Sequence, residues 1–284
     1  MHPKAFPVVA LALALSLSAV ARASDVSSYM KLEGVAGEST PPSLTNAIAI
    51  DPLLLDPNGF SITKRIDSTS LALSTAEVTA NPFSSATLYF YDDVLTDSQP
   101  DASLVLHTAL ISSITPVTLG SDPGERVAFA TLSPTLSLFL ELSGLSGESS
   151  APGHPGVIAV DSILLSGNGF SVLKTVDSTS SALLLAAISA NPFASATLLV
   201  YQNVLSETKP DLEFIFQRAL VSSVSSAPSS GEILKENAAF VAQGVTVVPE
   251  PTGLSTLAAG LVAVAALWRA RHSARRARAR LTSS

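Results

Sequence analysis

Residues 58–70 read NGFSITKRIDSTS, and residues 168–180 read NGFSVLKTVDSTS. The two stretches lie 110 positions apart, and two shorter motifs recur at the same distance: Gly37-Glu38-Ser39 at 147–149 and Asn81-Pro82-Phe83 at 191–193. Aligned without a gap, residues 31–115 and 141–225 are identical at 40 of 85 positions. Self-similarity at one fixed spacing marks a duplicated unit. The sequence therefore predicts two tandem copies of one domain, copy 1 and copy 2.

Each copy combines short alternating stretches with one helical stretch. The alternation predicts strands over 29–33, 47–50, 60–66, 87–91, 104–114 and 127–132, with 139–142 and 157–160 as examples in copy 2. Asp67 or Ser68 can cap a helix that runs to about Ala80, and the equivalent helix spans 178–190. The predicted fold class is mainly β, with two tandem β-barrel or sandwich domains that each carry one flanking α-helix.

Composition and charge exclude several classes of function. The chain has 284 residues and no cysteine, which excludes disulfides, thiolate metal sites and a cysteine nucleophile. All 23 acidic residues lie between residues 24 and 251, and only eight basic residues lie there with them. This central part of the chain therefore carries a net charge of −15. Nucleic-acid binding needs the opposite balance. We therefore expect no nucleic-acid partner.

The first 23 residues have the pattern of a secretory signal peptide. Lys4 precedes an apolar run from Phe6 to Val20, and Ala21-Arg22-Ala23 closes the segment with small residues at the positions of a cleavage site. The sequence predicts an N-terminal signal helix that is removed after Ala23, and hence export.

The C-terminal segment has three parts in a fixed order. Val248-Pro249-Glu250-Pro251 precedes an uncharged run over 252–268, which is at the lower limit of a membrane-spanning helix. A basic tail follows, composed of Arg269, Arg271, Arg275, Arg276, Arg278 and Arg280. By the positive-inside rule this tail stays cytoplasmic, so the upstream chain faces outward. The order resembles the PEP-CTERM sorting signal, which implies processing by an exosortase-type enzyme; a plain transmembrane anchor is the alternative.

The predicted organisation is a signal peptide over 1–23, copy 1 over 24–136, copy 2 over 137–247 and the sorting and anchor segment over 248–284. Five residues, 133–137, connect the last predicted strand of copy 1 to Leu138, and one of them is Pro134. A connection this short cannot act as a flexible tether. We therefore expect the copies to lie side by side in a restricted orientation.

No constellation of residues with a catalytic pattern stands out. His107 and His154 have no partner at a motif spacing, and the duplicated pairs Asp51/Asp161 and Asp67/Asp177 are explained as turn and cap residues. The acidic loop with Asp92, Asp93, Asp97 and Asp101 lacks the pattern of a calcium loop. We predict a protein without catalytic, metal-binding or cofactor-binding residues, and not an enzyme.

The order of motifs resembles the haemolysin-coregulated protein (Hcp) family, the tube subunits of type VI secretion systems. The resemblance lies in residues 31–39 (KLEGVAGES), in Gly147-Glu148-Ser149 with Gly153-His154 and 157–160, in the DSTS motifs and in Ser112-Ser113-Ile114. It implies a barrel of two sheets with a flanking helix, and hexameric rings that stack into tubes. Copy 1 has Leu44 where copy 2 has His154, and the signal peptide and the duplication also depart from the family.

Taken together, the sequence predicts a non-enzymatic, exported structural protein that is anchored in the envelope and then sorted to the surface or the extracellular matrix. Its expected partner is itself: if the contact between the copies replaces one ring interface, three chains form a pseudo-hexameric ring. The alternatives are an extracellular polysaccharide- or protein-binding module, and a component of a type VI secretion tube.

Overall fold

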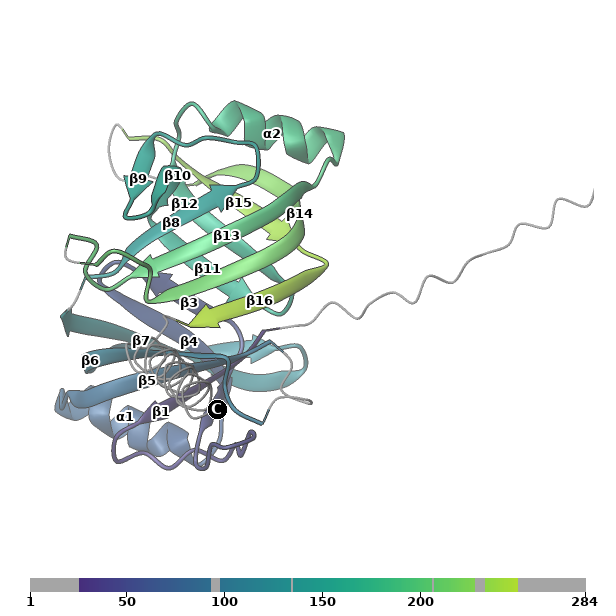
Figure 1. Ribbon diagram of the computed structural model, residues 1–284. Coiled ribbons are helices and arrows are strands. Elements are labelled where there is room, and N and C mark those ends of the chain that lie inside the picture. Colours follow the sequence, from purple (N-terminus) through teal and green to yellow (C-terminus); the bar gives the residue numbers. More distant parts are fainter. Residues whose placement is uncertain (1–25, 93–97, 134, 206, 228–232, 250–284) are drawn as a thin grey trace, which may run out of the picture.

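The computed structural model describes residues 26–92, 98–133, 135–205, 207–227 and 233–249, and confirms a mainly β protein with one helix in each copy (Figure 1). Copy 1 contains β1 (Ser27–Leu32), β2 (Ile48–Ile50), β3 (Leu53–Asp56), β4 (Gly59–Arg65), α1 (Thr69–Thr79), β5 (Phe83–Tyr91), β6 (Ala102–Leu119) and β7 (Asp122–Ser133). Copy 2 contains β8 (Ser137–Leu142), β9 (Ser149–Ala151), β10 (His154–Val160), β11 (Ser162–Ser166), β12 (Gly169–Thr175), α2 (Ser180–Ser189), β13 (Phe193–Tyr201), β14 (Leu212–Ala227), β15 (Lys235–Val241) and β16 (Gly244–Pro249).

Two corners curl each copy into a two-layered unit. At the first corner, β2 pairs with β1, whereas β3, which follows after Asp51-Pro52, pairs with β4. At the second corner, the start of β6 pairs with β5 and the remainder pairs with β7. The bend in β6 lies at Thr108, which has a positive φ of 56°, and the equivalent Arg218 of β14 has a φ of 51°. Non-glycine residues adopt this backbone region rarely, so its recurrence shows that both copies bend in the same way.

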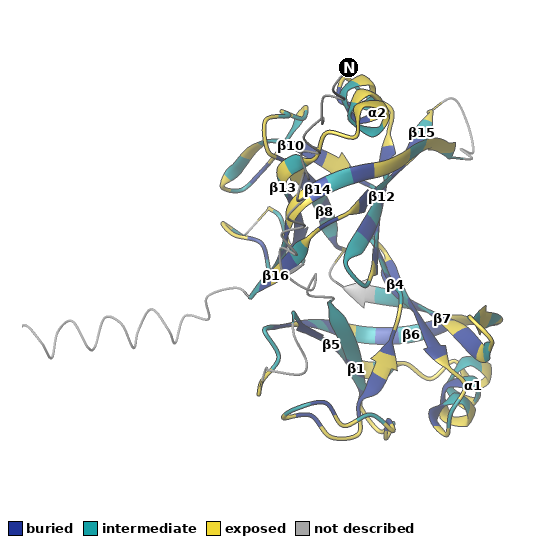
Figure 2. Cartoon of the chain, turned by 90° about the vertical axis from the view of Figure 1, so that its right-hand side faces the viewer, coloured by how far each residue is buried: buried dark blue, intermediate teal, exposed yellow. Residues whose placement is uncertain are grey.

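The copies join edge to edge through β3 and β11, so that all sixteen strands belong to one antiparallel sheet. Leu53 lies opposite Leu165, Leu54 opposite Leu164 and Leu55 opposite Ile163. The repeat distance is 110, so Leu165 is the counterpart of Leu55 and Ile163 is the counterpart of Leu53. Leu53 therefore lies opposite the counterpart of Leu55, and Leu55 lies opposite the counterpart of Leu53. The contact therefore has local two-fold symmetry about the Leu54–Leu164 pair. Helices α1 and α2 accordingly lie at opposite ends of the molecule (Figures 1 and 2).

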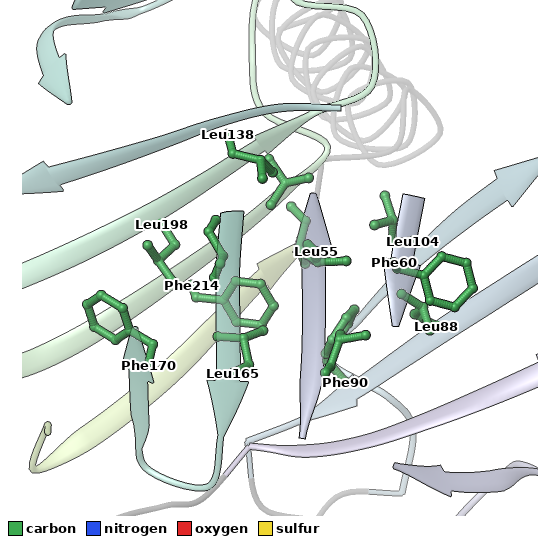
Figure 3. Close-up of a cluster of buried hydrophobic side chains, with 14 of the residues drawn as sticks. Leu55, Phe60, Leu88, Phe90, Leu104, Leu138, Leu165, Phe170, Leu198 and Phe214 are labelled. Atoms are coloured by element: carbon green, nitrogen blue, oxygen red, sulfur yellow. The ribbon is translucent and has the colours of Figure 1, made fainter. Parts of the chain in front are cut away.

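One hydrophobic core extends through both copies. Leu55, Phe60, Leu88, Phe90 and Leu104 of copy 1 and Leu138, Leu165, Phe170, Leu198 and Phe214 of copy 2 are all buried members of a single cluster (Figure 3). The rings of Phe90 and Phe214 meet edge to face across the contact, with their centroids 5.1 Å apart. Aromatic pairs in this geometry add to the free energy gained by burial alone.

The structure corrects the predicted extent of several strands. β3, β9, β11 and β16 were not predicted, and β6 extends five residues beyond the predicted end at Ile114. The additional part of β6 contains Pro116, and proline cannot donate to a sheet ladder. Pro116 is tolerated because the second half of β6 is an edge, bonded to β7 alone, and the amide of Ile114 two residues earlier points away from β7 to Glu77.

The predicted signal peptide, including Ala21 and Ala23, and the predicted membrane-spanning run over 252–268 with its arginine tail lie outside the described residues. Among the residues that the structure does describe, neither helix is long and apolar enough to cross a bilayer.

The register of the β3–β11 contact is testable because the chain has no native cysteine. In the variant Leu54→Cys/Leu164→Cys, the two thiols lie directly opposite each other, at the short Cβ separation of a cross-strand pair. We expect an intramolecular disulfide on mild oxidation, detected as a mass loss of about two daltons that dithiothreitol reverses. The control Leu54→Cys/Ile163→Cys places the second thiol on the other face of the sheet and stays reduced. Equal oxidation of both variants contradicts the register.

Candidate functional site

The most strongly charged buried site occurs twice, once in each copy. Lys64 of β4 lies 2.8 Å from the Asp67 carboxylate and 2.9 Å from the Glu125 carboxylate of β7. Its Nζ also donates to the Arg65 carbonyl at 2.7 Å and lies 3.2 Å from Ser70 Oγ. In copy 2, Lys174 Nζ makes the same contacts: 2.8 Å to Asp177, 2.9 Å to Glu236, 2.8 Å to the Thr175 carbonyl and 3.2 Å to Ser180 Oγ. We name these the lysine clusters.

Each lysine cluster fastens the start of a helix to the sheet. Asp67 Oδ1 accepts hydrogen bonds from the Thr69 amide at 2.9 Å and the Thr69 hydroxyl at 2.5 Å. Ser70 Oγ donates to Glu125 at 2.7 Å. The first of these bonds satisfies the Thr69 amide at the N-terminus of α1, which has no partner within the helix. The interpretation of Asp67 and Asp177 as capping residues is confirmed, although the helices begin two and three residues after them.

The Gly-Glu-Ser motif completes the same helix start. Glu38 accepts a hydrogen bond from the Ser68 amide at 3.0 Å, and Glu148 does so from the Ser178 amide at 3.2 Å. The preceding Gly37 passes so close to β2 that a Cβ on it would lie 2.1 Å from the Ala47 carbonyl oxygen. The duplicated motif is therefore explained by close packing and helix capping.

In each lysine cluster one ammonium is paired with two carboxylates. Burial raises the pKa of Asp67, but the hydrogen bonds from Lys64 and Thr69 outweigh it, so the net shift of this pKa is downward. Asp177 shows the same direction for the same reasons, through Lys174 and Thr179. An ammonium group has three protons to donate, and Lys64 has four acceptors within 3.2 Å. Lys64 therefore donates to groups of the same chain that hold the start of α1 against the sheet.

The remaining candidate residues lie apart from one another. His154 Nδ1 lies 3.0 Å from Glu141 Oε2, and His107 is exposed on β6 of the other copy. Asp101 of the acidic loop accepts the Asp92 amide at 2.8 Å, as Asp211 accepts the Gln202 amide at 2.6 Å. Asp93 and Asp97 lie outside the described residues. Within the part of the chain that the structure describes, no group of three or more His, Asp or Glu residues could hold a metal ion.

A cleft of about 460 Å³ lies beside the lysine cluster of copy 1, lined among others by Glu38, Asp51 and Arg65. Asp51 sits at the corner between β2 and β3, as the turn interpretation predicted. Its counterpart Asp161 lies 3.4 Å from Lys235 Nζ, whereas copy 1 has Gly124 at the position of Lys235. The two corners therefore differ in charge: the one in copy 2 has a paired lysine and the one in copy 1 has none.

Polar bonds supplement the apolar contact between the copies. Gln202 Nε2 donates to the Val105 carbonyl at 2.8 Å, and Ser166 Oγ lies 3.3 Å from Asp51 Oδ1. A main-chain bond joins Val26 to Gly167 at 3.3 Å. Gln202 replaces Asp92 of copy 1. Its role depends on a residue 97 positions away, which no local spacing reveals.

The symmetry of this contact corrects one expectation. Three chains were expected to form a pseudo-hexamer in which the contact between the copies replaces one ring interface. A cyclic ring needs head-to-tail contacts between different surfaces, whereas a two-fold contact uses the same surface on both sides. The β3–β11 contact is of the second kind. It therefore cannot stand in for a ring interface.

Comparisons with known proteins give weak similarities only. No family model matches the chain, and no curated protein matches it. Among solved structures, Hcp1 from Salmonella typhimurium is 23% identical, with a TM-score of 0.34 over 38% of this chain and 83% of that chain. A type six secretion system protein is 19% identical, with a TM-score of 0.35 over 40% and 83%. The secreted protein Hcp3 from Pseudomonas aeruginosa is 13% identical, with a TM-score of 0.35 over 42% and 93%. Scores at this level do not assign the chain to a family.

The two neighbouring cations Lys64 and Arg65 provide a matched test of burial. Lys64→Ala leaves the Glu125 carboxylate buried without its partner, so we expect a loss of about 3–5 kcal/mol in the free energy of unfolding. The Arg65–Asp122 pair is exposed, so Arg65→Ala should change the same quantity by about 0–1 kcal/mol. Urea denaturation measures both. Similar losses for the two variants contradict the structural role of the lysine cluster.

The lowered pKa values of Asp67 and Asp177 predict acid sensitivity. A carboxyl group whose pKa is lower in the folded state stabilises the fold above its unfolded pKa, and this contribution is lost as pH falls through the folded value. We expect stability to decline below about pH 4. Asp67→Asn/Asp177→Asn should be less stable at pH 7 and lose less stability between pH 5 and pH 3. Thermal unfolding across this range measures both effects, and parallel curves for variant and wild type contradict the assignment.

Proposed function

We propose that this chain is an exported, non-enzymatic assembly protein in which two Hcp-like β units are fused into one rigid block. The observation that carries the proposal is the duplication itself: two copies with the same corners, helix and lysine cluster are joined by a self-complementary strand pair. A block of this kind presents its two equivalent outer faces in opposite directions, which suits a building unit of a larger structure.

The environment of the polar residues supports a structural role. The carboxylates that repeat in both copies cap helices, bond turns or pair with lysine. Their partners are groups of the same chain. Such residues are explained by folding, without a substrate.

Export and surface sorting follow from the two ends of the chain. The signal peptide over 1–23 directs secretion, and the segment from Val248 onward is processed by an exosortase-type enzyme at the envelope. Val248 and Pro249 pair with Glu213 and Leu212 in β16, whereas Glu250 and Pro251 lie outside the described residues. The last strand thus includes the first two residues of the proposed sorting motif, which supports a signal that follows the folded block without a spacer.

The two-fold contact suggests how the blocks assemble. Rings implied by the Hcp resemblance require head-to-tail contacts, and the two copies of one chain face opposite ways. In the proposed arrangement each copy therefore joins a different ring, and the β3–β11 contact links two coaxial rings face to face. Six chains would then complete a double ring of twelve β units.

Light scattering and negative-stain microscopy on residues 24–249 test this arrangement. We expect a two-layered ring with the mass of six chains. The oxidised Leu54→Cys/Leu164→Cys variant is the control, since a cross-link inside the block should leave the particle unchanged. A particle of three chains contradicts the double ring, and a monomer at high concentration contradicts self-assembly altogether.

A protein-binding module is the second candidate, because α2 has an uncharged and apolar outer surface. Leu184, Leu185 and Ile188 are 49%, 65% and 75% exposed. The equivalent positions of α1 hold Ser74, Thr75 and Val78, so the exposed surface of α1 is less apolar at these positions. Exposed apolar patches often mark interaction sites.

A further inference from the structure

The strand that joins the copies pairs with its own counterpart. Leu54 lies opposite Leu164, which is the same position of the repeat, and the flanking pairs are related by a two-fold axis through this pair. A pairing with this symmetry has the same geometry whichever copy supplies each strand. We infer that β3 is a self-recognising surface whose partner is the same strand of another copy of the β unit, and that four residues decide which copies pair.

The apolar part of the contact does not distinguish the copies. The inward side chains Leu53, Leu55, Ile163 and Leu165 are all buried and of similar size. Phe90 of copy 1 lies against Phe214 of copy 2. Phe90 corresponds to Val200 in copy 2, and Phe214 corresponds to Leu104 in copy 1. If two molecules of copy 1 paired with each other, Phe90 of one would face Leu104 of the other. If two molecules of copy 2 paired, Phe214 of one would face Val200 of the other. Each combination therefore fills a similar volume.

The first discriminating pair is Ser166 and Asp51, whose side-chain oxygens lie 3.3 Å apart. The counterpart of Ser166 in copy 1 is Asp56. A pair of two copy 1 units would thus place Asp51 opposite Asp56 on both sides of the two-fold axis. In copy 2, Lys235 compensates the charge of Asp161, whereas copy 1 has Gly124 at that position. Like charges across an interface disfavour that combination.

The second discriminating residue is Gln202, which donates to the carbonyl oxygen of Val105 on the open edge of β6. Its counterpart Asp92 has a carboxylate, which cannot donate. In copy 2, the counterpart of Val105 is Ile215, which already lies opposite Thr246 of β16. The bond therefore forms only when copy 2 supplies the glutamine and copy 1 supplies the edge. Asp51, Asp56, Ser166 and Gln202 together select the pairing of copy 1 with copy 2.

The test uses the whole chain with a specific protease site inserted between Ser133 and Pro134, cleaved after folding. We expect the two halves to remain a one-to-one complex, with a dissociation constant measured by dilution and mass photometry. Ser166→Asp, which reproduces the like charges of a copy 1 pair, should raise this constant at least tenfold. The control Ser225→Asp makes the same change on the β14–β15 hairpin, opposite Asn237, and should leave it within twofold. Equal constants for both variants overturn the inference.

A second measurement follows the choice of partner. The cleaved chain is unfolded in urea and refolded, and native mass spectrometry counts the three possible pairs. Wild type should yield copy 1–copy 2 pairs with few copy 1 pairs, and Asp56→Ser should raise the copy 1 pairs severalfold. An unchanged distribution for Asp56→Ser overturns the assignment of specificity. Both measurements concern the separated halves, so their outcome is independent of whether the intact chain is exported or forms rings.

Discussion

The pairing of β3 with β11 is the constraint on which the rest of the structure depends. Each copy curls at Asp51 or Asp161, and this leaves the outer edge of β3 or β11 without a partner in its own copy. An unpaired edge exposes main-chain donors and acceptors and invites uncontrolled association. The other copy covers that edge with the equivalent strand. Because the contact is two-fold, it also fixes the helices at opposite ends and merges the two interiors into one core.

Within each copy, the lysine cluster joins three elements that are distant in sequence. Lys64 comes from β4, Ser70 from α1 and Glu125 from β7, and the ammonium lies within 3.2 Å of both side chains. Removing these charges from water is costly, and close hydrogen bonds are needed to offset that cost. The cluster satisfies this requirement, which explains why the lysine, the DSTS motif and the glutamate recur together in both copies.

The repeat was predictable because identical motifs at one spacing need no knowledge of packing. The helix and most strands were also predictable, because caps and alternation are local signals. β3 was missed since Leu53–Asp56 is a short apolar run without alternation, which periodicity alone cannot assign. The burial of the Lys64 ammonium was not predictable, because its partner Glu125 lies 61 residues away. The two-fold contact was out of reach, because a short connection restricts the distance between copies but not the symmetry of their contact.

The differences between the copies follow from the covalent link itself. In copy 2 the chain continues after β15 into β16, which covers the first half of β14. In copy 1 the equivalent residues are 133–138. Ser133 still pairs with His107 of β6, but 137–138 already belong to β8, so no described strand takes the place of β16 beside β6 before His107. The open edge at Val105 is thus a direct consequence of connecting one copy to the next. Gln202 partly closes that edge from the other copy. A symmetric pair of units cannot stay symmetric once it is fused, and the substitutions at the contact compensate for the strand that the connection removes.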